Sequence, residues 1–234
     1  MRPSRLLAMP VSLLALALVA GPAAGQTEVT RSVAGGGVSV PGWTGQIDSR
    51  AAASGQTLSD AKLEMDGEAM HVITGPAVTY WNPENTATGD YTVTATFLEP
   101  KYMNLNNHPH PYGIFIGGNG LGTDHQSLLY CAAYGNGSFI VRGFGPDAFQ
   151  VNGRRGEQNA AVHTAAGEGQ PVTQEIAMSV RGDVIECAIN GTVVGSYPVS
   201  EVVSDGRLSS TDGVYGIRSA HNTEALVSGL SISR

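Results

Sequence analysis

The sequence predicts an all-β fold, an antiparallel jelly-roll β-sandwich made of two packed sheets. Residues 112–144 contain three strand-like runs, YGIFIGG, QSLLYCAAY and SFIVRGF, separated by glycine-rich corners, as in an antiparallel meander. In residues 91–97, apolar side chains alternate with three threonines, which is the period of a strand with one buried face. The chain has 31 glycines and 14% charged residues, a composition that favours many turns over amphipathic surface helices.

The first 25 residues are predicted to be a secretory signal peptide. Arg2 and Arg5 precede an apolar run from Leu6 to Ala20, and small residues follow it. The run has 15 residues, fewer than the ~20 that a membrane-spanning helix needs. Cleavage after Gly25 would leave 209 of the 234 residues and a periplasmic or secreted protein without a membrane anchor. That length suits one large β domain.

The remaining chain is predicted to be one domain, residues 43–234, behind a flexible lead-in. Residues 26–42 contain three consecutive glycines and little apolar periodicity. In the domain, residues 61–73 form a hairpin signal with its turn at Asp66 and Gly67. A short strand is predicted for 77–81, closed by Asn82 and Pro83.

Two long segments are predicted to be loops. Residues 100–111 are too rich in amides and prolines to extend a strand ladder. Residues 145–171 are weakly patterned over 27 positions, and loops of that length in compact domains are usually functional or disordered. We therefore expect long loops to frame a ligand site in the hollow of one sheet.

The C-terminal part predicts two successive hairpins and a closing strand pair. Residues 172–180 and 184–190 are joined through Gly182 and Asp183, and 192–197 returns after a second turn. A two-residue first turn predicts three apolar cross-strand pairs: Val180–Ile185, Met178–Cys187 and Ile176–Ile189. Two further strands are expected in 212–233, around a polar corner at 221–224.

Several of these runs resemble one known superfamily. GDYTVTATF, HPHPYGIFIGG, SLLYCAAYGNGSFIVRGF, VIECAINGTVVG and DGVYGIRSAHNTEALVSGLSIS are similar to the concanavalin A-like lectin/glucanase superfamily. More narrowly, they resemble its exported bacterial laminin-G-like members and 3-keto-disaccharide hydrolase domains. The resemblance covers Trp43 to the C-terminus. It implies a jelly-roll sandwich and an association with carbohydrate, because many relatives bind or cleave glycans on the concave sheet.

The charge balance of the chain narrows the classes of partner that it can bind. Without Arg2 and Arg5 of the leader, the 13 basic residues fall to 11 against 20 acidic ones, a net charge of −9. This balance opposes binding to nucleic acid or to an anionic membrane, both of which need a basic surface.

Cys131 and Cys187 both lie in predicted strands, and export permits a disulfide between them. The sequence leaves equally open that the two cysteines are unbridged thiols buried in the core.

A catalytic signature is not predicted. Glu64, Asp66 and Glu68 spell ExDxE, which is similar to the catalytic strand of the superfamily's retaining glucanases. Such a strand must be continuous, whereas Asp66 and Gly67 form the best turn signal of the region. An enzyme would then need acids from separated strands, such as Glu186 or Glu224, with one raised pKa.

Metal and cofactor sites are not predicted either. Three of His108, His110, His125 and His221 could converge on a metal, but their spacing matches no compact ligand motif. Calcium is conceivable and is not predicted. Loop histidines and asparagines more commonly hydrogen-bond backbone or a polar ligand.

The candidate ligand-binding residues supply planar polar groups and aromatic faces, which suit a sugar. They are Trp81, Asn82, His108, Tyr112, Tyr130, Arg142, Arg218, His221 and Asn222. Strand parity places Arg142 and Arg218 outside if Val141 and Ile217 are in the core. A three-residue turn at 135–137 would put Tyr130 and Tyr134 on the face of Arg142, whereas a two-residue turn at Asn136 and Gly137 would place both in the core.

The sequence therefore predicts an exported, lectin-like carbohydrate-binding protein without catalytic activity. Its expected partner is a glycan or a sugar-containing ligand, and neither nucleic acid nor membrane insertion after signal cleavage is expected. One alternative is a glycoside hydrolase or a 3-keto-disaccharide hydrolase-like enzyme. A second alternative is a structural or protein-interaction domain, which would show an exposed apolar patch.

Overall fold

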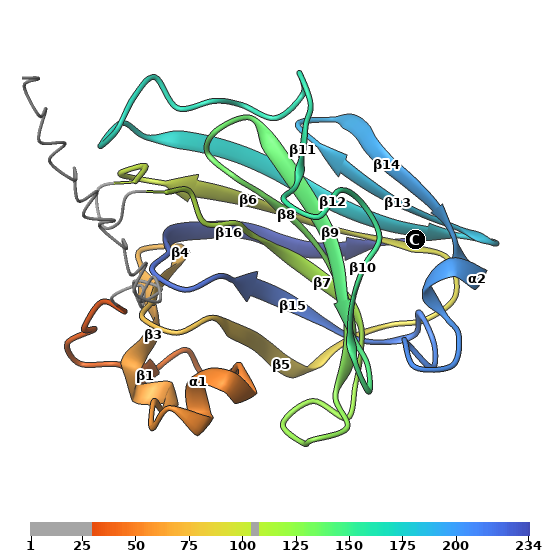
Figure 1. Cartoon of the computed structure of the whole chain (residues 1–234), viewed down its shortest axis with the longest axis horizontal. Helices are drawn as coiled ribbons and strands as arrows, with labels where there is room; N and C mark the ends of the chain where they lie inside the picture. The colour runs from red at the N-terminus through yellow and green to blue at the C-terminus, as the bar shows by residue number, and fades with distance from the viewer. Residues whose placement is uncertain (1–29, 104–107) are drawn as a thin grey trace, which may run out of the picture.

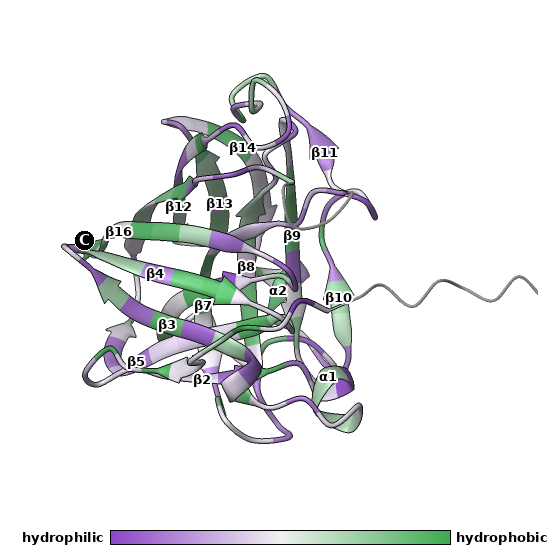
Figure 2. Cartoon of the chain, turned by 90° about the vertical axis from the view of Figure 1, so that its left-hand side faces the viewer, coloured by the Kyte–Doolittle hydropathy of each residue, from purple (hydrophilic) through white to green (hydrophobic). Residues whose placement is uncertain are grey.

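The computed structural model describes residues 30–103 and 108–234, and it confirms the predicted all-β sandwich. Two sheets face each other: Figure 2 shows β3, β4 and β16 on one side of the molecule and β9 and β10 on the other. The predicted signal peptide lies outside the described residues. Within them, no helix has the length and apolar character needed to cross a membrane.

The first sheet has the strand order β1-β3-β4-β16-β6-β12-β13-β14. Its strands are β1 (Gly37–Val38), β3 (Ala61–Asp66), β4 (Ala69–Thr74), β16 (Glu224–Ser233), β6 (Tyr91–Glu99), β12 (Val172–Arg181), β13 (Val184–Ile189) and β14 (Thr192–Pro198). Neighbours in this sheet are antiparallel except β1 and β3, which pair in parallel.

The second sheet has the order β10-β9-β8-β7-β15-β5-β2, and β11 also pairs with β9. Its strands are β10 (Ala148–Gln150), β9 (Ser138–Phe144), β8 (Ser127–Ala133), β7 (Tyr112–Asn119), β15 (Gly213–Ser219), β5 (Val78–Ala87), β2 (Thr44–Ile47) and β11 (Glu157–Gln158). The short helices α1 (Ser49–Ala53), α2 (Val199–Val202) and η1 (Leu58–Asp60) lie outside the sheets, with α1 and α2 at opposite ends (Figure 1).

The core lies between the sheets and follows from strand alternation. In β6, Tyr91, Val93, Ala95 and Phe97 are fully buried while the intervening threonines are partly exposed, as predicted. The ring of Phe97 stacks on that of Tyr112 from the second sheet, with centroids 5.6 Å apart. Burial of a valine or phenylalanine side chain contributes about 1.5–3 kcal/mol, so the alternating faces hold the two sheets together.

The predicted register of β12 and β13 is confirmed. Val180 pairs with Ile185, Met178 with Cys187 and Ile176 with Ile189, and all six side chains are buried in the core. Gly182 of the connecting two-residue turn has φ = 54°, a conformation that glycine adopts without steric cost.

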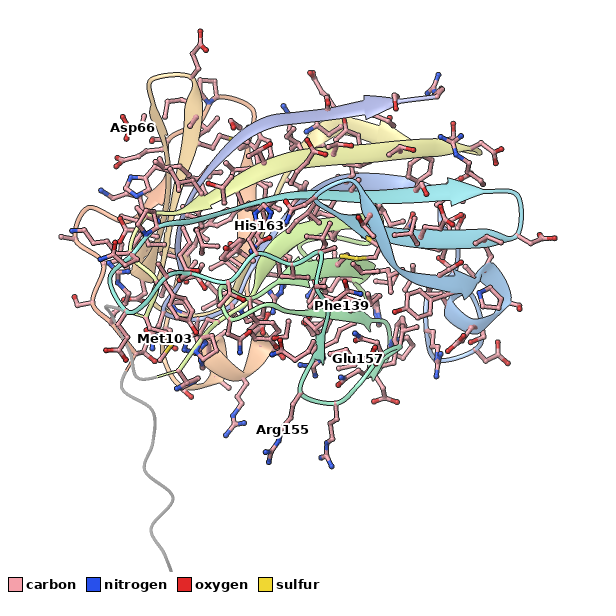
Figure 3. The ribbon with its side chains drawn as sticks, turned by 90° about the horizontal axis from the view of Figure 1, so that it is seen from above. Asp66, Met103, Phe139, Arg155, Glu157 and His163 are labelled. Carbon is pink, nitrogen blue, oxygen red and sulfur yellow. A yellow bond between two sulfur atoms is a disulfide. The ribbon has the colours of Figure 1, made fainter. Side chains whose placement is uncertain are left out.

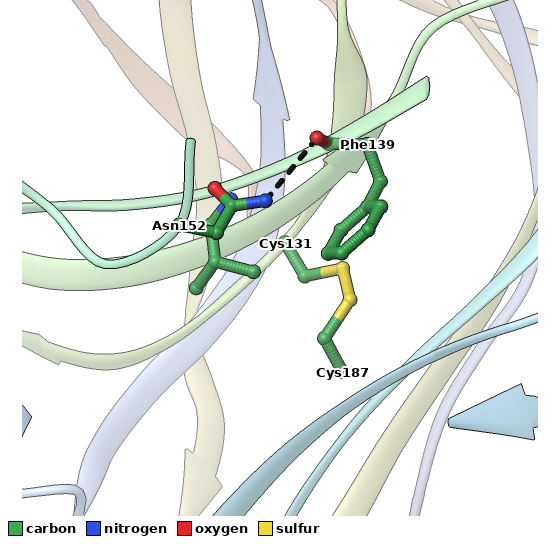
Figure 4. Close-up of a disulfide and its surroundings, with 5 residues drawn as sticks. Cys131, Phe139, Asn152 and Cys187 are labelled. Atoms are coloured by element: carbon green, nitrogen blue, oxygen red, sulfur yellow. Dashed lines mark hydrogen bonds between the residues drawn. A yellow bond between two sulfur atoms is a disulfide. The ribbon is translucent and has the colours of Figure 1, made fainter. Parts of the chain in front are cut away.

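A disulfide links the two sheets. Cys131 of β8 and Cys187 of β13 are joined, with their Cα atoms 6.0 Å apart (Figure 4). Phe139 lies beside the bridge, and its carbonyl accepts a hydrogen bond from Asn152 Nδ2 at 3.3 Å. Of the two arrangements that the sequence left open, the structure contains the bridged one.

Other segments differ from the sequence-based expectation. Residues 30–42 of the expected flexible lead-in belong to the domain, because β1 pairs with β3 and Val40 is buried. The β3–β4 turn is Gly67–Glu68, since Asp66 pairs with Ala69. The expected loop 145–171 supplies β10 and β11 to the edge of β9, while its Arg155 points away from the sheets (Figure 3).

β5 also runs further than expected, through Pro83 to Ala87. The ladder with β15 shifts register here, because Trp81 pairs with Gly216 and Thr86 with Val214. Proline lacks a backbone N–H and is tolerated at such a bulge, which explains why Pro83 does not end the strand.

Candidate functional site

The outer face of the second sheet, which points away from the core, carries the candidate site. Val141 and Ile217 are in the core, so their neighbours Arg142 and Arg218 point outward, as strand parity predicts. The β8–β9 connection is the three-residue turn 135–137, closed by a hydrogen bond from the Tyr134 N–H to the Ser138 carbonyl at 2.8 Å. Tyr130 consequently pairs with Arg142 and lies on the outer face.

Arg218 is the best-anchored group on this face. Only 6% of it is exposed, and it makes a bidentate pair with Asp48: Nη1 donates to Oδ1 and Nη2 to Oδ2, both at 2.7 Å. Nη1 also donates to Thr79 Oγ1 at 3.2 Å. Burial alone would lower the pKa of Arg218, but the charge and hydrogen bonds of Asp48 raise it overall, so the guanidinium stays charged.

The position of Asp48 shows that this ion pair is preferred over a local interaction. Asp48 follows β2 and occupies the N-cap of α1, where an aspartate side chain usually accepts a backbone N–H of the first turn. Here it makes no capping hydrogen bond, because its oxygens face Arg218. A lost cap costs about 1 kcal/mol, less than a charge-assisted bidentate pair contributes.

Aromatic rings support the guanidinium. Arg218 Cζ lies 5.0 Å from the ring centroid of Phe144 and 5.7 Å from that of Tyr130, and these two rings stack with centroids 6.1 Å apart. The strand neighbours of Arg218 are Thr79 and Gly113, and a Cβ at Gly113 would meet the Cys131 carbonyl oxygen at 1.9 Å. Glycine is therefore required there, and no side chain of β7 competes for the space beside Arg218.

Three imidazoles meet at the same end of the sheet. The ring centroids of His110 and His221 are 4.1 Å apart, those of His108 and His110 are 4.3 Å apart, and those of His108 and His221 are 6.2 Å apart. His110 is 7% exposed. Burial, together with the neighbouring His221 and His108, lowers the pKa of His110 to about 3, so its ring is neutral at physiological pH.

These groups surround a hollow of about 320 Å³, which we call the outer hollow. Its lining is Asp48, Ala77, His108, Pro109, His110, Pro111, Tyr130, Tyr134, Arg142, Arg218, Ala220 and His221. This volume lies at the lower end of the range of about 300–1,000 Å³ for small-molecule sites. Asp48 is the one acid among the described residues of the lining. Burial raises the pKa of Tyr134, so its phenol is a neutral donor and acceptor.

Five of the nine predicted ligand-binding residues line the outer hollow: His108, Tyr130, Arg142, Arg218 and His221. Their loops and strands meet because β7, β8, β9 and β15 are neighbours in the sheet.

The other four predicted residues lie elsewhere. Tyr112 is fully buried in the core, because the inward positions of β7 are 112, 114 and 116. Trp81 does point outward, but it is 6% exposed and covered by the loop at Gly122. It belongs to an apolar cluster on the outer face, with Phe115, Leu128, Tyr130, Ala132 and Ile140. Neither residue offers an open aromatic face.

Both predicted asparagines have structural roles. Asn82 Oδ1 accepts the Glu84 N–H on its own strand at 3.0 Å, and Asn82 is not part of the lining of the outer hollow. Asn222 is 3% exposed, and its Oδ1 accepts the Arg31 N–H at 2.8 Å. Its φ of 54° explains the residue type, since asparagine tolerates the left-handed region better than most.

Sequence reasoning missed Asp48 and Phe144 as parts of the site. Asp48 is 170 residues from Arg218, and no local pattern connects the two. Tyr134 was expected beside Arg142 only with a three-residue turn, and the structure has that turn. Phe144 had a usable signal, because it shares the outward parity of Arg142. The sequence raised the convergence of three histidines but could not identify which three meet, because they come from two loops.

The acids that a glycosidase was expected to use, Glu186 and Glu224, are not part of the lining of the outer hollow, and neither is Glu99. Burial raises the pKa of Glu99 to about 7, but Glu99 lines a separate cavity of about 10 Å³, which has room for a water molecule and not for a sugar ring. Glu224 pairs with His71 at 3.1 Å, and Glu186 lies opposite Ser179 in the first sheet. Asp66 of the ExDxE segment is exposed at the periphery (Figure 3).

A larger hollow of about 470 Å³ lies under the 203–209 loop. Its lining is His125, Ser127, Pro146 and residues 203–209. It contains no tyrosine, tryptophan or phenylalanine ring and has a single histidine, so it lacks the aromatic surface that sugar recognition uses. The outer hollow is the better candidate on chemical grounds.

No protein-family model matches the chain, and no curated protein matches it. Among solved structures, the chain is similar to a protein of unknown function with a galectin-like fold from Bacillus subtilis. The two chains are 11% identical and superpose with a TM-score of 0.55, and the match covers 81% of this chain and 88% of that one. Weaker similarities include the carbohydrate-binding module CBM66 from Bacillus subtilis (10% identity, TM-score 0.45, 84% and 98% covered) and sheep galectin-11 (11%, 0.40, 63% and 92%). The similarity shows the fold alone, a galectin-like β-sandwich, which agrees with the sandwich that the sequence resemblance implied.

Proposed function

We propose that this protein is an exported, lectin-like carbohydrate-binding protein, and that its ligand site is the outer hollow. The observation that carries the proposal is the convergence of guanidinium, imidazole, phenol and carboxylate groups around one space of about 320 Å³. Sugars present hydroxyl groups in fixed directions, and such planar polar groups can bind pairs of them. The galectin-like fold is compatible with this use but does not by itself specify it.

The lining divides into a rigid floor and an accessible wall. Arg218 and Tyr130 are each 6% exposed and form the floor. Asp48 has a side chain that is 33% exposed, and each of its oxygens already accepts one hydrogen bond from Arg218. A carboxylate has about four acceptor positions, so Asp48 can also accept hydrogen bonds from sugar hydroxyls. Arg142 and Tyr134 are partly exposed and would supply donors and a ring face from the wall.

Pre-organisation also favours this site. The bidentate geometry fixes Asp48 and Arg218 before a ligand arrives, and the stacked rings fix the guanidinium from below. Groups that are already held in place lose little conformational entropy on binding, which matters for a small ligand with few contacts.

The experiment is a glycan-array screen of the purified protein, paired with a hydrolysis assay on every glycan that binds. We expect binding without turnover. Arg142→Ala should lose the signal, whereas Arg181→Ala should keep it, because Arg181 is exposed at the turn between β12 and β13 of the first sheet. Turnover of a bound glycan would instead favour a glycosidase. The absence of any hit, or equal binding by both variants, would contradict the proposed site.

A further inference from the structure

The chain topology forces two histidine-bearing loops together. β7 begins at Tyr112 and β15 ends at Ser219, and these two residues pair across the antiparallel ladder. The ladder extends one step further, because the Ala220 N–H donates to the Pro111 carbonyl at 2.9 Å. Residues just before 111 and just after 220 must therefore lie side by side, whatever their sequence.

The local sequence then directs the two imidazoles of the first loop. His108 precedes Pro109 and His110 precedes Pro111, and a residue before proline is restricted to extended conformations. In an extended segment, residues two apart point to the same side. His108 and His110 are thus presented together, and His221 meets them from the neighbouring loop.

The distances fit a metal site. One ring nitrogen from each of His108, His110 and His221 can be chosen so that all three atoms lie within 4.8 Å of one another. Tetrahedral zinc with Zn–N bonds of about 2.0–2.1 Å places its ligand nitrogens about 3.4 Å apart. A contraction of about 1.4 Å or less would therefore bring the three nitrogens into a coordination sphere, and small side-chain rotations can supply it.

We propose that His108, His110 and His221 bind a divalent first-row transition metal ion, with Zn²⁺ as the best-suited physiological ion. Neutral imidazole nitrogen is a preferred ligand of zinc, copper and nickel, whereas calcium and magnesium take oxygen ligands. Three protein ligands leave one position of a tetrahedral ion open. All three histidines line the outer hollow, so a molecule in that hollow could occupy this position.

A second, small cavity adjoins two of the three histidines. The cavity of about 10 Å³ is lined by His108 and His110 and also by Glu99, Glu224 and Lys101. Carboxylates next to metal-binding histidines commonly orient the rings and make them better ligands. His108 and His110 thus line both the outer hollow and this small cavity, which contains carboxylate groups. The metal proposal does not depend on glycan binding.

The test is a calorimetric titration of the untagged, chelator-treated protein with Zn²⁺ alone. We expect one ion per chain. His108→Asn and His221→Asn should each weaken zinc binding by about 100-fold or more, since changes outside the ligand sphere alone cost about 10–100-fold. His125→Asn is the matched control and should bind as the parent does, because His125 lies in a different loop, on the rim of the 470 Å³ hollow.

A Co²⁺ spectrum gives an independent readout of the ligands. Visible absorption bands of four-coordinate Co²⁺ should appear in the parent and in His125→Asn and disappear in the two cluster variants. Unfolding midpoints without metal should agree among the variants, which separates loss of a ligand from loss of the fold. No zinc binding by the parent, or unchanged affinity in both cluster variants, would overturn the proposal.

Discussion

Asp48→Asn should destabilise the protein more than Arg218→Met does, although both substitutions break the same ion pair. The asymmetry follows from exposure: Arg218 is 6% exposed, whereas the side chain of Asp48 is 33% exposed. Without the carboxylate, a buried guanidinium loses its counter-charge and water reaches it poorly. Without the guanidinium, Asp48 can turn to solvent and recover hydration.

The magnitudes follow from the two hydrogen bonds of 2.7 Å. Removing one partner of a buried pair costs about 3–5 kcal/mol, and the partial exposure of Asp48 places Asp48→Asn near the lower end, at about 3 kcal/mol. Arg218→Met keeps most of the apolar stem and should cost about 1–2 kcal/mol, including the lost contact with the aromatic rings. The double variant should lose less than the sum of the two single losses, because the sites are coupled.

Urea or guanidinium unfolding measures these free energies directly. Asp66→Asn is the control, because Asp66 is exposed at the end of β3 and should change stability by less than about 0.5 kcal/mol. Equal losses for Asp48→Asn and Arg218→Met, or a larger loss for Arg218→Met, would refute the reasoning from burial.

Two further predictions concern the fold. Replacing Cys131 and Cys187 by alanine should lower the free energy of unfolding by about 4 kcal/mol, because the bridge closes a loop of 56 residues and so reduces the entropy of the unfolded chain. A loss below about 1 kcal/mol in denaturant unfolding would contradict this argument. Burial raises the pKa of Glu99 from 4.5 to about 7. Between these pH values the folded state holds a proton that the unfolded state releases, so the free energy of unfolding should fall as pH rises, by up to about 3 kcal/mol. In unfolding measurements at pH 5 and pH 8 with a chelator present, Glu99→Gln should remove this loss of stability with pH. If the free energy of unfolding of Glu99→Gln falls as much as that of the parent, Glu99 is not the cause of the pH dependence.

Much of the fold could be predicted because its signals are local. Alternation in β6 gives the buried face directly, and the β12–β13 register follows from one glycine-containing turn and three apolar pairs. The limits are equally physical. In β7 seven consecutive residues are buried, so no alternation distinguishes the core side. Tyr112 was therefore named as a ligand-binding residue although it is fully buried in the core.

The candidate site was harder to predict because its parts are held by long-range pairing. Strand parity was enough for Arg142 and Arg218, but the partner of Arg218 comes from the residue after β2, at the opposite end of the chain. The histidine cluster depends on the pairing of Tyr112 with Ser219, which no ligand spacing along the sequence can reveal.

The most direct measurement of the central claim is the affinity of Arg142→Ala for the glycan that binds the parent best, compared with that of Arg181→Ala. A hydrogen bond from a charged group contributes about 1.5–3 kcal/mol, so the loss of Arg142 should weaken binding by roughly 10–150-fold. Arg181→Ala should match the parent. If Arg142→Ala binds as tightly as the parent, or if Arg181→Ala loses affinity as well, the ligand does not bind in the outer hollow.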